Sequence, residues 1–584
     1  MPGPAPPARA AALAAECAVD AVAAFERYNA EFRAITRRAP LHFEERDWQS
    51  SQRDAVERIE LYGGYVERTV ASLRLRLGSD ALERQLWATI KQEFARLIEP
   101  MPDAEFRKTF FNSLTRTFFG TIGVSPEIEF VALDLDPLAR VADYDFMASY
   151  ANRGSLRLVL EEVLSSFRCK APWRDFDRTV RTVTDAVERQ LAETGTLRVA
   201  ECVEMIRPAF FQMTRAYLVG RIVGDGWHLP LVIVVKNTER GMLVDVVMTR
   251  DTDVSVLFSF TRSYFHVDLE RVGKAVLFLK QLMPHKPVSE LFTVIGRAKQ
   301  GKTERYRELF RHLQTAGDQF VLAPGERGLV MVVFTLPSFD VVFKLIRDRF
   351  PVQKNIARED VLRKYEFVFK HDRAGRLVDA QEFKRLRFPR RLFDPALLAE
   401  LRAETTASVH EDGEDLIIDH CYIERRMTPL NIYLRQAAAE EAEQAVFEYG
   451  QAIRDLAYTN IFAGDLLLKN FGVTRNRRVI FYDYDELCLV TDCRFRELPA
   501  AESDEDELRA ETWYYVGDSD VFPETFINFL GFDDRLRQAF LAAHGEVLTA
   551  EWWRGVQERL RANDVLEVLP YTARGVRVAS SAWA

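Results

Sequence analysis

Hydrophobic residues recur every three or four positions through most of the first 220 residues, and charged residues fill the positions between them. The runs 54–77 and 81–99 show this spacing most clearly. Such a repeat gathers the apolar side chains on one face of a helix. The pattern therefore predicts a largely helical segment over 10–220.

The pattern changes between residues 229 and 269, where β-branched and aromatic runs are separated by Asn, Gly and Asp. Runs of this type are typical of strands in a small antiparallel sheet. Residues 269–315 return to helical spacing. The four predicted strands are 229–237, 241–249, 253–261 and 264–269.

A second change begins near residue 318. The order strand, glycine turn, strand, tight turn, strand occupies 319–348, and helical spacing follows over 358–371. A buried strand (415–424), a long helix (441–461) and a strand pair around 471–485 come next. We therefore predict an α+β protein with a mostly helical domain over 1–316 and a second domain over 317–584.

Composition excludes several classes of protein. Lys and Arg number 79 against 88 Asp and Glu, a net charge of −9, which argues against a general nucleic-acid binder. The six cysteines form no CxxC pair and the nine histidines no zinc motif, so a reducing, cytoplasmic setting is expected. No run of about 18 apolar residues occurs, so no membrane partner is expected.

The strongest chemical signal is a series of elements in the second half. A glycine-containing turn comes first, and Lys344 lies on a strand after it. Asp465 follows the long helix, with Asn470 five residues later, and Asp483 stands at the end of a strand. The turn consists of Ala323, Pro324, Gly325, Glu326, Arg327, Gly328 and Leu329.

Phosphoryl transfer needs these residue types. Backbone N–H groups of a glycine turn can approach phosphates, and Lys344 can neutralise their charge. A carboxylate such as Asp465 orients the attacking hydroxyl, while Asn470 and Asp483 can hold Mg²⁺ or Mn²⁺ against ATP.

The order of these elements resembles that of a protein kinase, and the predicted fold of 317–584 is a bilobal kinase-like domain. Three departures stand out. The turn is G-x-x-G, and the catalytic loop has no His-Arg before Asp465. Leu467 replaces the usual lysine of that loop, although Lys469 could substitute for it. The metal motif reads D-Y-D-E.

Longer segments narrow the resemblance. The stretches 323–350, 421–434 and 464–488 resemble the bacterial isocitrate dehydrogenase kinase/phosphatase family, as do the length and the helical first half. The resemblance implies an enzyme that phosphorylates an active-site serine of homodimeric isocitrate dehydrogenase and also removes that phosphate. It further implies one site for ATP and ADP, a weak ATPase, a regulatory N-terminal domain and AMP as allosteric effector. Such an enzyme controls flux between the citric acid cycle and the glyoxylate bypass.

The resemblance also implies roles for individual residues. The turn would cover the ATP phosphates with Lys344, Asp465 would be the kinase base, and Glu424 to Met427 would form the adenine hinge. Asp485 and Glu486 would serve the phosphatase direction. Asp379 matches a family aspartate assigned to the active site, although its position in the sequence does not place it in the cleft.

Other interpretations stay open at this stage. A pseudokinase-like scaffold would bind nucleotide without turnover, and a haloacid-dehalogenase-type phosphatase would use Asp483 as nucleophile. Two formal motif matches, the Walker A pattern of 296–303 and the C-x5-R pattern of 488–494, are weaker. The first loop is charged rather than glycine-rich, and the second has no glycine to wrap a phosphate.

Overall fold

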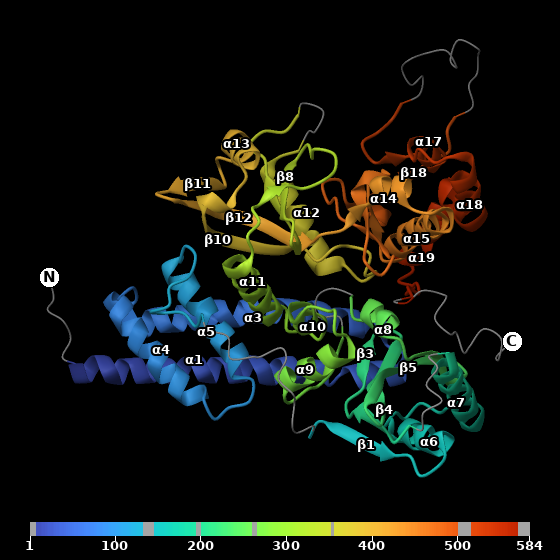
Figure 1. Ribbon diagram of the computed structural model, residues 1–584, viewed down its shortest axis with the longest axis horizontal. Helices are drawn as coiled ribbons and strands as arrows, with labels where there is room; N and C mark the ends of the chain where they lie inside the picture. Colours follow the sequence, from blue (N-terminus) through green and yellow to red (C-terminus); the bar gives the residue numbers. More distant parts are fainter. Residues whose placement is uncertain are drawn as a thin grey trace. The chain divides into compact units, whose positions relative to one another are not determined.

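The chain divides into two compact units in the computed structural model (Figure 1). The first unit comprises Met1–Gly317, Arg385–Phe388 and Tyr571–Ala584, and the second comprises Asp318–Lys384 and Pro389–Pro570. The structure describes residues 7–131, 145–193, 200–259, 265–351, 356–499, 515–569 and 571.

Long helices build the beginning of the first unit, as the apolar spacing predicts. Helices α1 and α3, of 30 residues each, pack against one another and against α4 and α5 around an aromatic core that includes Phe25, Tyr62 and Phe110. The helices are α1 (Pro7–Thr36), α2 (Ala39–Glu45), α3 (Trp48–Leu77), α4 (Arg84–Ile98) and α5 (Ala104–Phe119).

A six-stranded antiparallel sheet forms the other part of the first unit. Its order is β1-β2-β4-β5-β6, and β3 pairs with β4. Helices α6 and α7 share a core cluster with strands of this sheet. The elements are β1 (Met147–Ala151), α6 (Leu156–Ser166), α7 (Phe176–Glu193), β2 (Cys202–Ile206), β3 (Phe210–Gln212), β4 (Arg215–Gly224), β5 (Trp227–Thr238) and β6 (Gly241–Met248).

Three sequence predictions about this region are wrong. The helical segment predicted over 10–220 contains β1, β2, β3 and part of β4, because pairing within the sheet overrides the local apolar spacing. The predicted strand 253–261 is instead helix α8 (Asp251–Leu257) where the structure describes it. Asp251 and Asp253 lie in the first turn of α8, where carboxylates favour a helix start.

The third wrong prediction concerns the strand 264–269. Of this segment, the described residues 265–269 form no strand, and His266 makes only an isolated bridge to Phe211.

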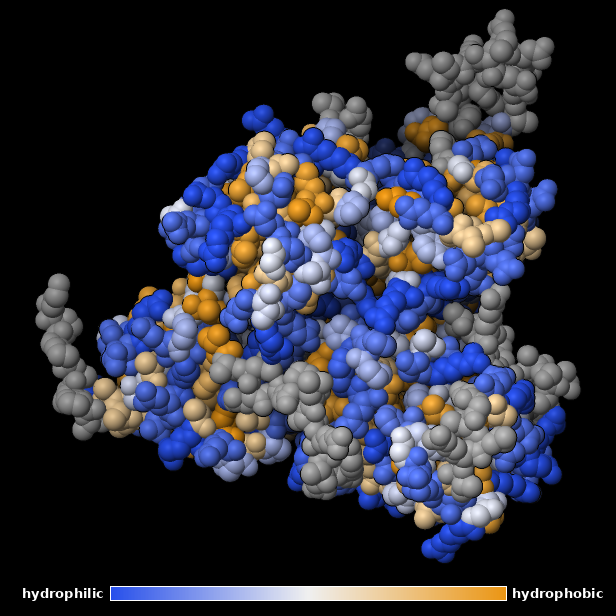
Figure 2. Space-filling model, viewed as in Figure 1, coloured by the Kyte–Doolittle hydropathy of each residue, from blue (hydrophilic) through white to orange (hydrophobic). Residues whose placement is uncertain are grey.

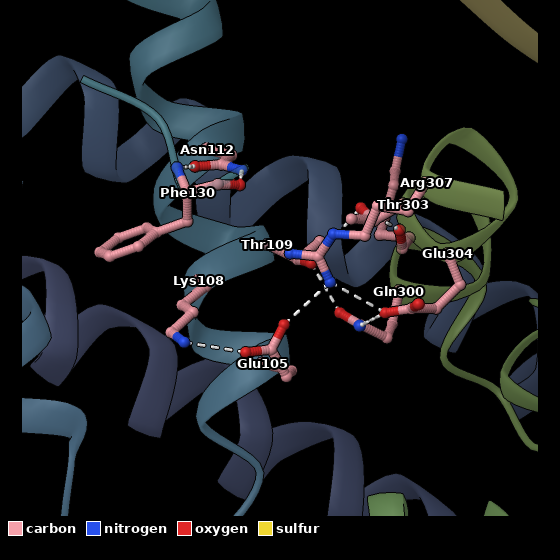
Figure 3. A network of polar contacts seen from close by, with 10 residues as sticks. Glu105, Lys108, Thr109, Asn112, Phe130, Gln300, Thr303, Glu304 and Arg307 are labelled. Atoms are coloured by element: carbon pink, nitrogen blue, oxygen red, sulfur yellow. Dashed lines mark hydrogen bonds and ion pairs between the residues drawn. The ribbon is translucent and has the colours of Figure 1, made fainter. Parts of the chain in front are cut away.

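Helices complete the first unit, as predicted for 269–315. They are α9 (Val272–Leu282), α10 (Val288–Val294) and α11 (Ala298–Thr315). Figure 3 shows how polar side chains join α5 to α11: Thr109 donates to Gln300 at 2.6 Å, and Arg307 contacts Glu105 at 2.8 Å. Most of the Walker A match of 296–303 therefore lies inside a packed helix, not in a phosphate-binding loop.

The second unit begins with a six-stranded sheet. Its order is β10-β12-β9-β8-β7, with β11 on β12, and two helices accompany it. The elements are β7 (Val321–Leu322), β8 (Met331–Leu336), β9 (Phe339–Ile346), α12 (Arg358–His371), β10 (Gln381–Pro389), α13 (Pro395–Glu404), β11 (Val409–Asp412) and β12 (Asp415–Arg425).

The remainder of the second unit is mainly helical and holds short strand pairs. The second unit thus combines a sheet with helices, as predicted for a kinase-like α+β domain. The long helices of the first unit agree with the predicted helical first domain. The elements are β13 (Thr428–Pro429), α14 (Leu430–Gln436), α15 (Ala439–Tyr458), β14 (Ile461–Phe462), β15 (Phe471–Val473), β16 (Val479–Phe481), β17 (Cys488–Leu489), β18 (Arg494–Phe495), β19 (Asp520–Val521), α17 (Phe526–Phe529), α18 (Asp534–His544) and α19 (Ala550–Arg561).

Hydrophilic residues cover most of the face shown in Figure 2, and hydrophobic residues appear on it in small groups. Within the described part of the chain, no helix combines the length and the apolar character needed to cross a membrane.

Candidate active site

One cavity of about 390 Å³ in the second unit gathers most of the residues that the sequence predicts for the site. The whole turn 323–329 and Lys344 line it. Asp379 and Glu486 are not among its lining residues. The other predicted residues in the lining are Glu424, Met427, Asp465, Asn470, Asp483 and Asp485.

The glycine turn connects β7 to β8 over one wall of the cavity. Gly325 has a φ of 133°, which a residue with a side chain rarely adopts. Arg347 fixes the far end of the turn, since its Nε donates to the Gly328 carbonyl at 3.0 Å while its Nη2 contacts Glu400 at 2.7 Å. These contacts give the turn a defined shape.

Lys344 points from β9 into the cavity and is held there by two acceptors. Its Nζ lies 2.8 Å from Glu424 Oε2 and donates to the Tyr482 carbonyl at 2.6 Å. Strand β9 pairs with β12 so that Lys344 is opposite Tyr422, two residues before Glu424. The strand register thus sets the position of the ammonium group.

Glu424 is 1% exposed and forms an ion pair with Lys344. The sequence alone does not reveal this pairing. Burial raises the pKa of this carboxyl above its usual value, and the nearby Asp483 and Asp379 carboxylates raise it further, against the opposing charge of Lys344. Among the described residues no donor reaches its Oε1. Glu424 lines the cavity, and a carboxylate oxygen can accept a hydrogen bond from an amino group such as that of adenine.

Most protein kinases supply the acidic partner of the strand lysine from the next helix. Here that helix is α12, and its Glu366 instead contacts Lys370 at 3.0 Å. Tyr365 of α12 occupies the space facing β12, stacked on Tyr422 with ring centroids 3.8 Å apart. The ion pair is therefore built within the sheet.

Asp465 stands in the loop after β14, in the position of a catalytic-loop aspartate. Its Oδ1 accepts a hydrogen bond from the Leu467 N–H at 3.0 Å, and Tyr449 of α15 donates to the Leu466 carbonyl at 2.5 Å. Gly464 has a φ of 74°, and a Cβ there would lie 2.6 Å from Glu486. Glycine thus lets the loop approach the segment after β16 and present Asp465 to the cavity.

Asn470 and Asp483 line the same part of the cavity. Asn470 is 4% exposed, and its Nδ2 donates to the Asp465 carbonyl at 3.3 Å. The Tyr482 N–H, next to Asp483, donates to the Asn470 carbonyl at 3.0 Å. These two hydrogen bonds join the segments of the two predicted metal ligands to the catalytic loop.

Asp379 reaches the neighbourhood of the site through a stretch without regular structure. The segment before it runs parallel to β16, since the Phe481 N–H donates to the Arg376 carbonyl at 2.7 Å and the Val378 N–H to the Phe481 carbonyl at 3.1 Å. Asp379 is close enough to Glu424 to influence the pKa of that carboxyl. No periodic pattern in the sequence could have predicted this placement.

The donors present fit a nucleotide with a divalent cation. Mg²⁺ prefers oxygen ligands and is commonly bound by one or two carboxylates together with phosphate oxygens. Asp483 and Asn470 offer such oxygens, and no cluster of three or more His, Cys, Asp or Glu suited to a metal is found among the described residues. Phosphate oxygens of a bound nucleotide would supply further ligands to such a cation.

Sequence reasoning missed several residues that shape the site. Arg347 and Glu400 fix the turn, and Tyr482 receives Lys344. Lys469 lines the cavity and contacts Glu326 of the turn at 3.3 Å, so it is placed as the substitute for the missing loop lysine. Spacing in the sequence did identify Lys469, whereas Arg347, Glu400 and Tyr482 carry no such signal.

Comparisons with known proteins agree with this geometry. Residues 18–317 match the family model for the isocitrate dehydrogenase kinase/phosphatase (AceK) regulatory domain, and residues 318–573 match that for its kinase domain. A protein of Anaeromyxobacter sp. (strain Fw109-5) named isocitrate dehydrogenase kinase/phosphatase is 46% identical over 559 residues, 96% of this chain and 97% of its own. One of the same name from Xanthomonas euvesicatoria pv. vesicatoria (strain 85-10) is 47% identical over 550 residues, 94% and 95% of the two chains. The chain therefore belongs to the isocitrate dehydrogenase kinase/phosphatase family.

Proposed function

We propose that this chain phosphorylates isocitrate dehydrogenase on an active-site serine with ATP and also removes that phosphate, at one nucleotide site. The observation that carries the proposal is the single cavity lined by the glycine turn, Lys344, Asp465, Asn470 and Asp483. The names of the relatives supply the protein substrate and the two activities. A weak ATPase, regulation by AMP and control of flux into the glyoxylate bypass are part of the same proposal.

The side chains of the cavity have separate roles in the proposed reaction. Lys344 compensates charge on the nucleotide phosphates, and the N–H groups of the turn cover them. Asp465 orients the serine hydroxyl and accepts its proton in the kinase direction, then returns a proton to the serine oxygen in the phosphatase direction. A divalent cation, when bound by Asn470 and Asp483, supplies further charge compensation on the phosphates. Glu424 and Met427 border the adenine.

The haloacid-dehalogenase alternative finds little support in the surroundings of Asp483. That fold places its nucleophile after a strand of a parallel sheet with alternating helices. Strand β16, which precedes Asp483, pairs antiparallel with β15 in a three-stranded sheet. A phospho-enzyme trapped at Asp483 and cleaved by hydroxylamine would nevertheless favour this alternative.

The test uses intact isocitrate dehydrogenase, labelled ATP and Mg²⁺, followed by removal of ATP and addition of ADP. We expect label to enter the dehydrogenase in the first step and to leave it in the second. Asp465→Asn should abolish labelling, whereas Asp534→Asn, at an exposed start of α18, should not. Nucleotide binding without any transfer of label would establish the pseudokinase-like scaffold instead.

A further inference from the structure

Two thiols of the second unit lie in contact outside the cavity. Cys488 Sγ is 3.5 Å from Cys493 Sγ, and Cys493 Sγ also lies 3.5 Å from the Leu489 carbonyl oxygen. Cys488 belongs to β17 and is half-buried, while Cys493 is buried just after a single helical turn over Val490–Asp492. The proposed enzyme chemistry uses neither thiol.

Surrounding hydrogen bonds hold the two thiols on the same side of this short turn. The Gln557 side-chain amide donates to the carbonyls of Val490 and Cys493 at 2.7 and 2.8 Å. The Thr491 N–H donates to Asn460 Oδ1 at 3.1 Å. A disulfide has an S–S length of about 2.05 Å, so the sulfurs need to approach by only about 1.5 Å (3.5 minus 2.05).

The environment favours a thiolate at Cys488 over one at Cys493, Cys17, Cys169 or Cys202. A hydrogen bond from Cys493 holds the pKa of the Cys488 thiol below its usual value. Burial of Cys488 raises this pKa in part, and the positive charge of Lys364 lowers it further. Burial raises the pKa of Cys17 to about 11 and raises the pKa of Cys169 and Cys202. Because the thiolate is the reactive form, Cys488 should react first.

We propose that Cys488 and Cys493 form a reversible modification site that closes into a disulfide when the enzyme meets a low-molecular-weight disulfide such as oxidised glutathione. The Cys488 thiolate attacks one glutathione sulfur, which forms a mixed disulfide and releases one glutathione thiolate. The Cys493 thiolate then attacks the Cys488 sulfur and releases the second. Two cysteine thiols are oxidised, one glutathione disulfide is reduced, and the cysteine protons pass to the released thiolates.

The position of the pair connects its oxidation to the active site. Cys488 is paired with Phe462 between β17 and β14, and Phe462 is three residues before Asp465. Asp485 is three residues before Cys488, and Glu486 contacts the catalytic loop at Gly464. Strand β17 is therefore linked to Asp465 through its pairing with β14, and to Asp485 directly along the chain. Closing the disulfide moves this strand and with it the surroundings of both carboxylates.

The test exposes the native, reduced protein to oxidised glutathione at neutral pH and analyses the peptide Val479–Arg494, which trypsin releases with both cysteines. We expect this peptide to lose two hydrogens and to regain them with dithiothreitol, while the other four cysteines stay open to alkylation. Two free thiols after the treatment, or oxidation spread over all six cysteines, would overturn the proposal. This measurement does not depend on the proposed function.

Variants separate the two steps of the reaction. Cys493→Ser should stop at a stable glutathione adduct on Cys488, Cys488→Ser should take up none, and Cys421→Ser, at a fully buried thiol, should behave as the parent. Phenylarsine oxide, which bridges two adjacent thiols, should bind the parent once and neither Cys488→Ser nor Cys493→Ser. An adduct on Cys493 first would contradict the assigned order.

The activity measurement rests on the proposed function. We expect both rates to fall by about ten- to a hundredfold in the oxidised enzyme, because a displacement of ~1 Å at a catalytic group has effects of this size. Cys493→Ser treated alike but then freed of its adduct should keep its rates. Unchanged rates in a fully oxidised sample would disprove the link to the active site.

Discussion

The pairing of Lys344 with Glu424 shows how individual residues of this site depend on one another. Both side chains are almost fully buried. An isolated buried charge destabilises a fold, and here each charge of the pair compensates for the other. Lys344 also contacts the backbone of the segment that carries Asp483. A change at either residue therefore affects folding as well as catalysis, and experiments must separate the two effects.

Lys344→Met should depress kinase and phosphatase rates together if, as proposed, one lysine serves one shared nucleotide. The rates and nucleotide affinity should be measured beside thermal stability, since the variant leaves Glu424 unpaired. The double variant Lys344→Met/Glu424→Gln should recover stability without activity, and Lys370→Met, on the surface of α12, should change neither. A phosphatase that survives the loss of Lys344 and still requires nucleotide would rule out the shared site.

Asp485→Ala should reduce phosphatase activity more than kinase activity, by about a hundredfold against a few-fold. Removal of a serine phosphate needs a positioned water, and Asp485 is a cavity carboxylate that ordinary kinases do not have at this place. Both rates should be measured on the same purified sample. Asp534→Ala is the matched control, because Asp534 is exposed and outside the cavity lining. Equal losses of kinase and phosphatase activity in Asp485→Ala would show that Asp485 has only a structural role.

At the scale of elements, the segment beside β16 is fixed by a buried arginine. Arg376 has no exposed surface, and it contacts Asp455 at 2.7 Å and Glu448 at 2.8 Å, both on α15. It also donates to the Val479 carbonyl of β16 at 3.1 Å. Helix α15 and strand β16 thus share one cation, three residues before Asp379.

Arg376→Met should destabilise the second unit by about 3–5 kcal/mol, because it leaves two buried carboxylates with only part of their compensation. Chemical denaturation with a probe in the second unit would measure this loss. Arg363→Met, which removes an exposed ion pair with Asp360 on α12, should change stability by less than about 0.5 kcal/mol. A loss for Arg376→Met no larger than this control would contradict the role assigned to the buried network.

The elements also explain what the sequence could predict. Helix α12 was predicted over the same residues that form it, because its apolar spacing agrees with its surroundings in the fold. The position of α8 was predicted as strand because a short run of Val and Leu has no period of its own. Asp379 could be associated with the site only through family resemblance, since its position depends on a backbone pairing with β16 that leaves no local signal.

At the scale of the whole molecule, each unit has hydrophobic core clusters of its own. Among the described residues, one such cluster lies in the second unit, with members from Val330 to Leu566, and two others lie in the first unit. Two such bodies in one chain commonly depart from all-or-none unfolding. The cavity lined by Lys344 and Asp465, which we propose binds the nucleotide, belongs to the second unit alone.

We expect calorimetric unfolding to show two transitions, of which Mg²⁺ and ADP raise mainly one, because a ligand stabilises the body that binds it. Arg376→Met should lower the same transition that ADP raises. Glu304→Gln, in the buried network of α11, should lower the other. A single transition that moves as a whole with ADP and with both variants would show that the units unfold together.

The construction of the Lys344–Glu424 pair within one sheet has a consequence for selective inhibition. Ordinary protein kinases are switched by moving the helix that carries the glutamate, and an inhibitor can trap the inactive position of that helix. In this chain both partners are on adjacent strands whose register is fixed by hydrogen bonds, so helix α12 can shift without breaking the pair. We expect compounds that depend on an outward helix to be ineffective here, and compounds shaped to the Glu424 carboxylate to distinguish this family from the protein kinases of a host.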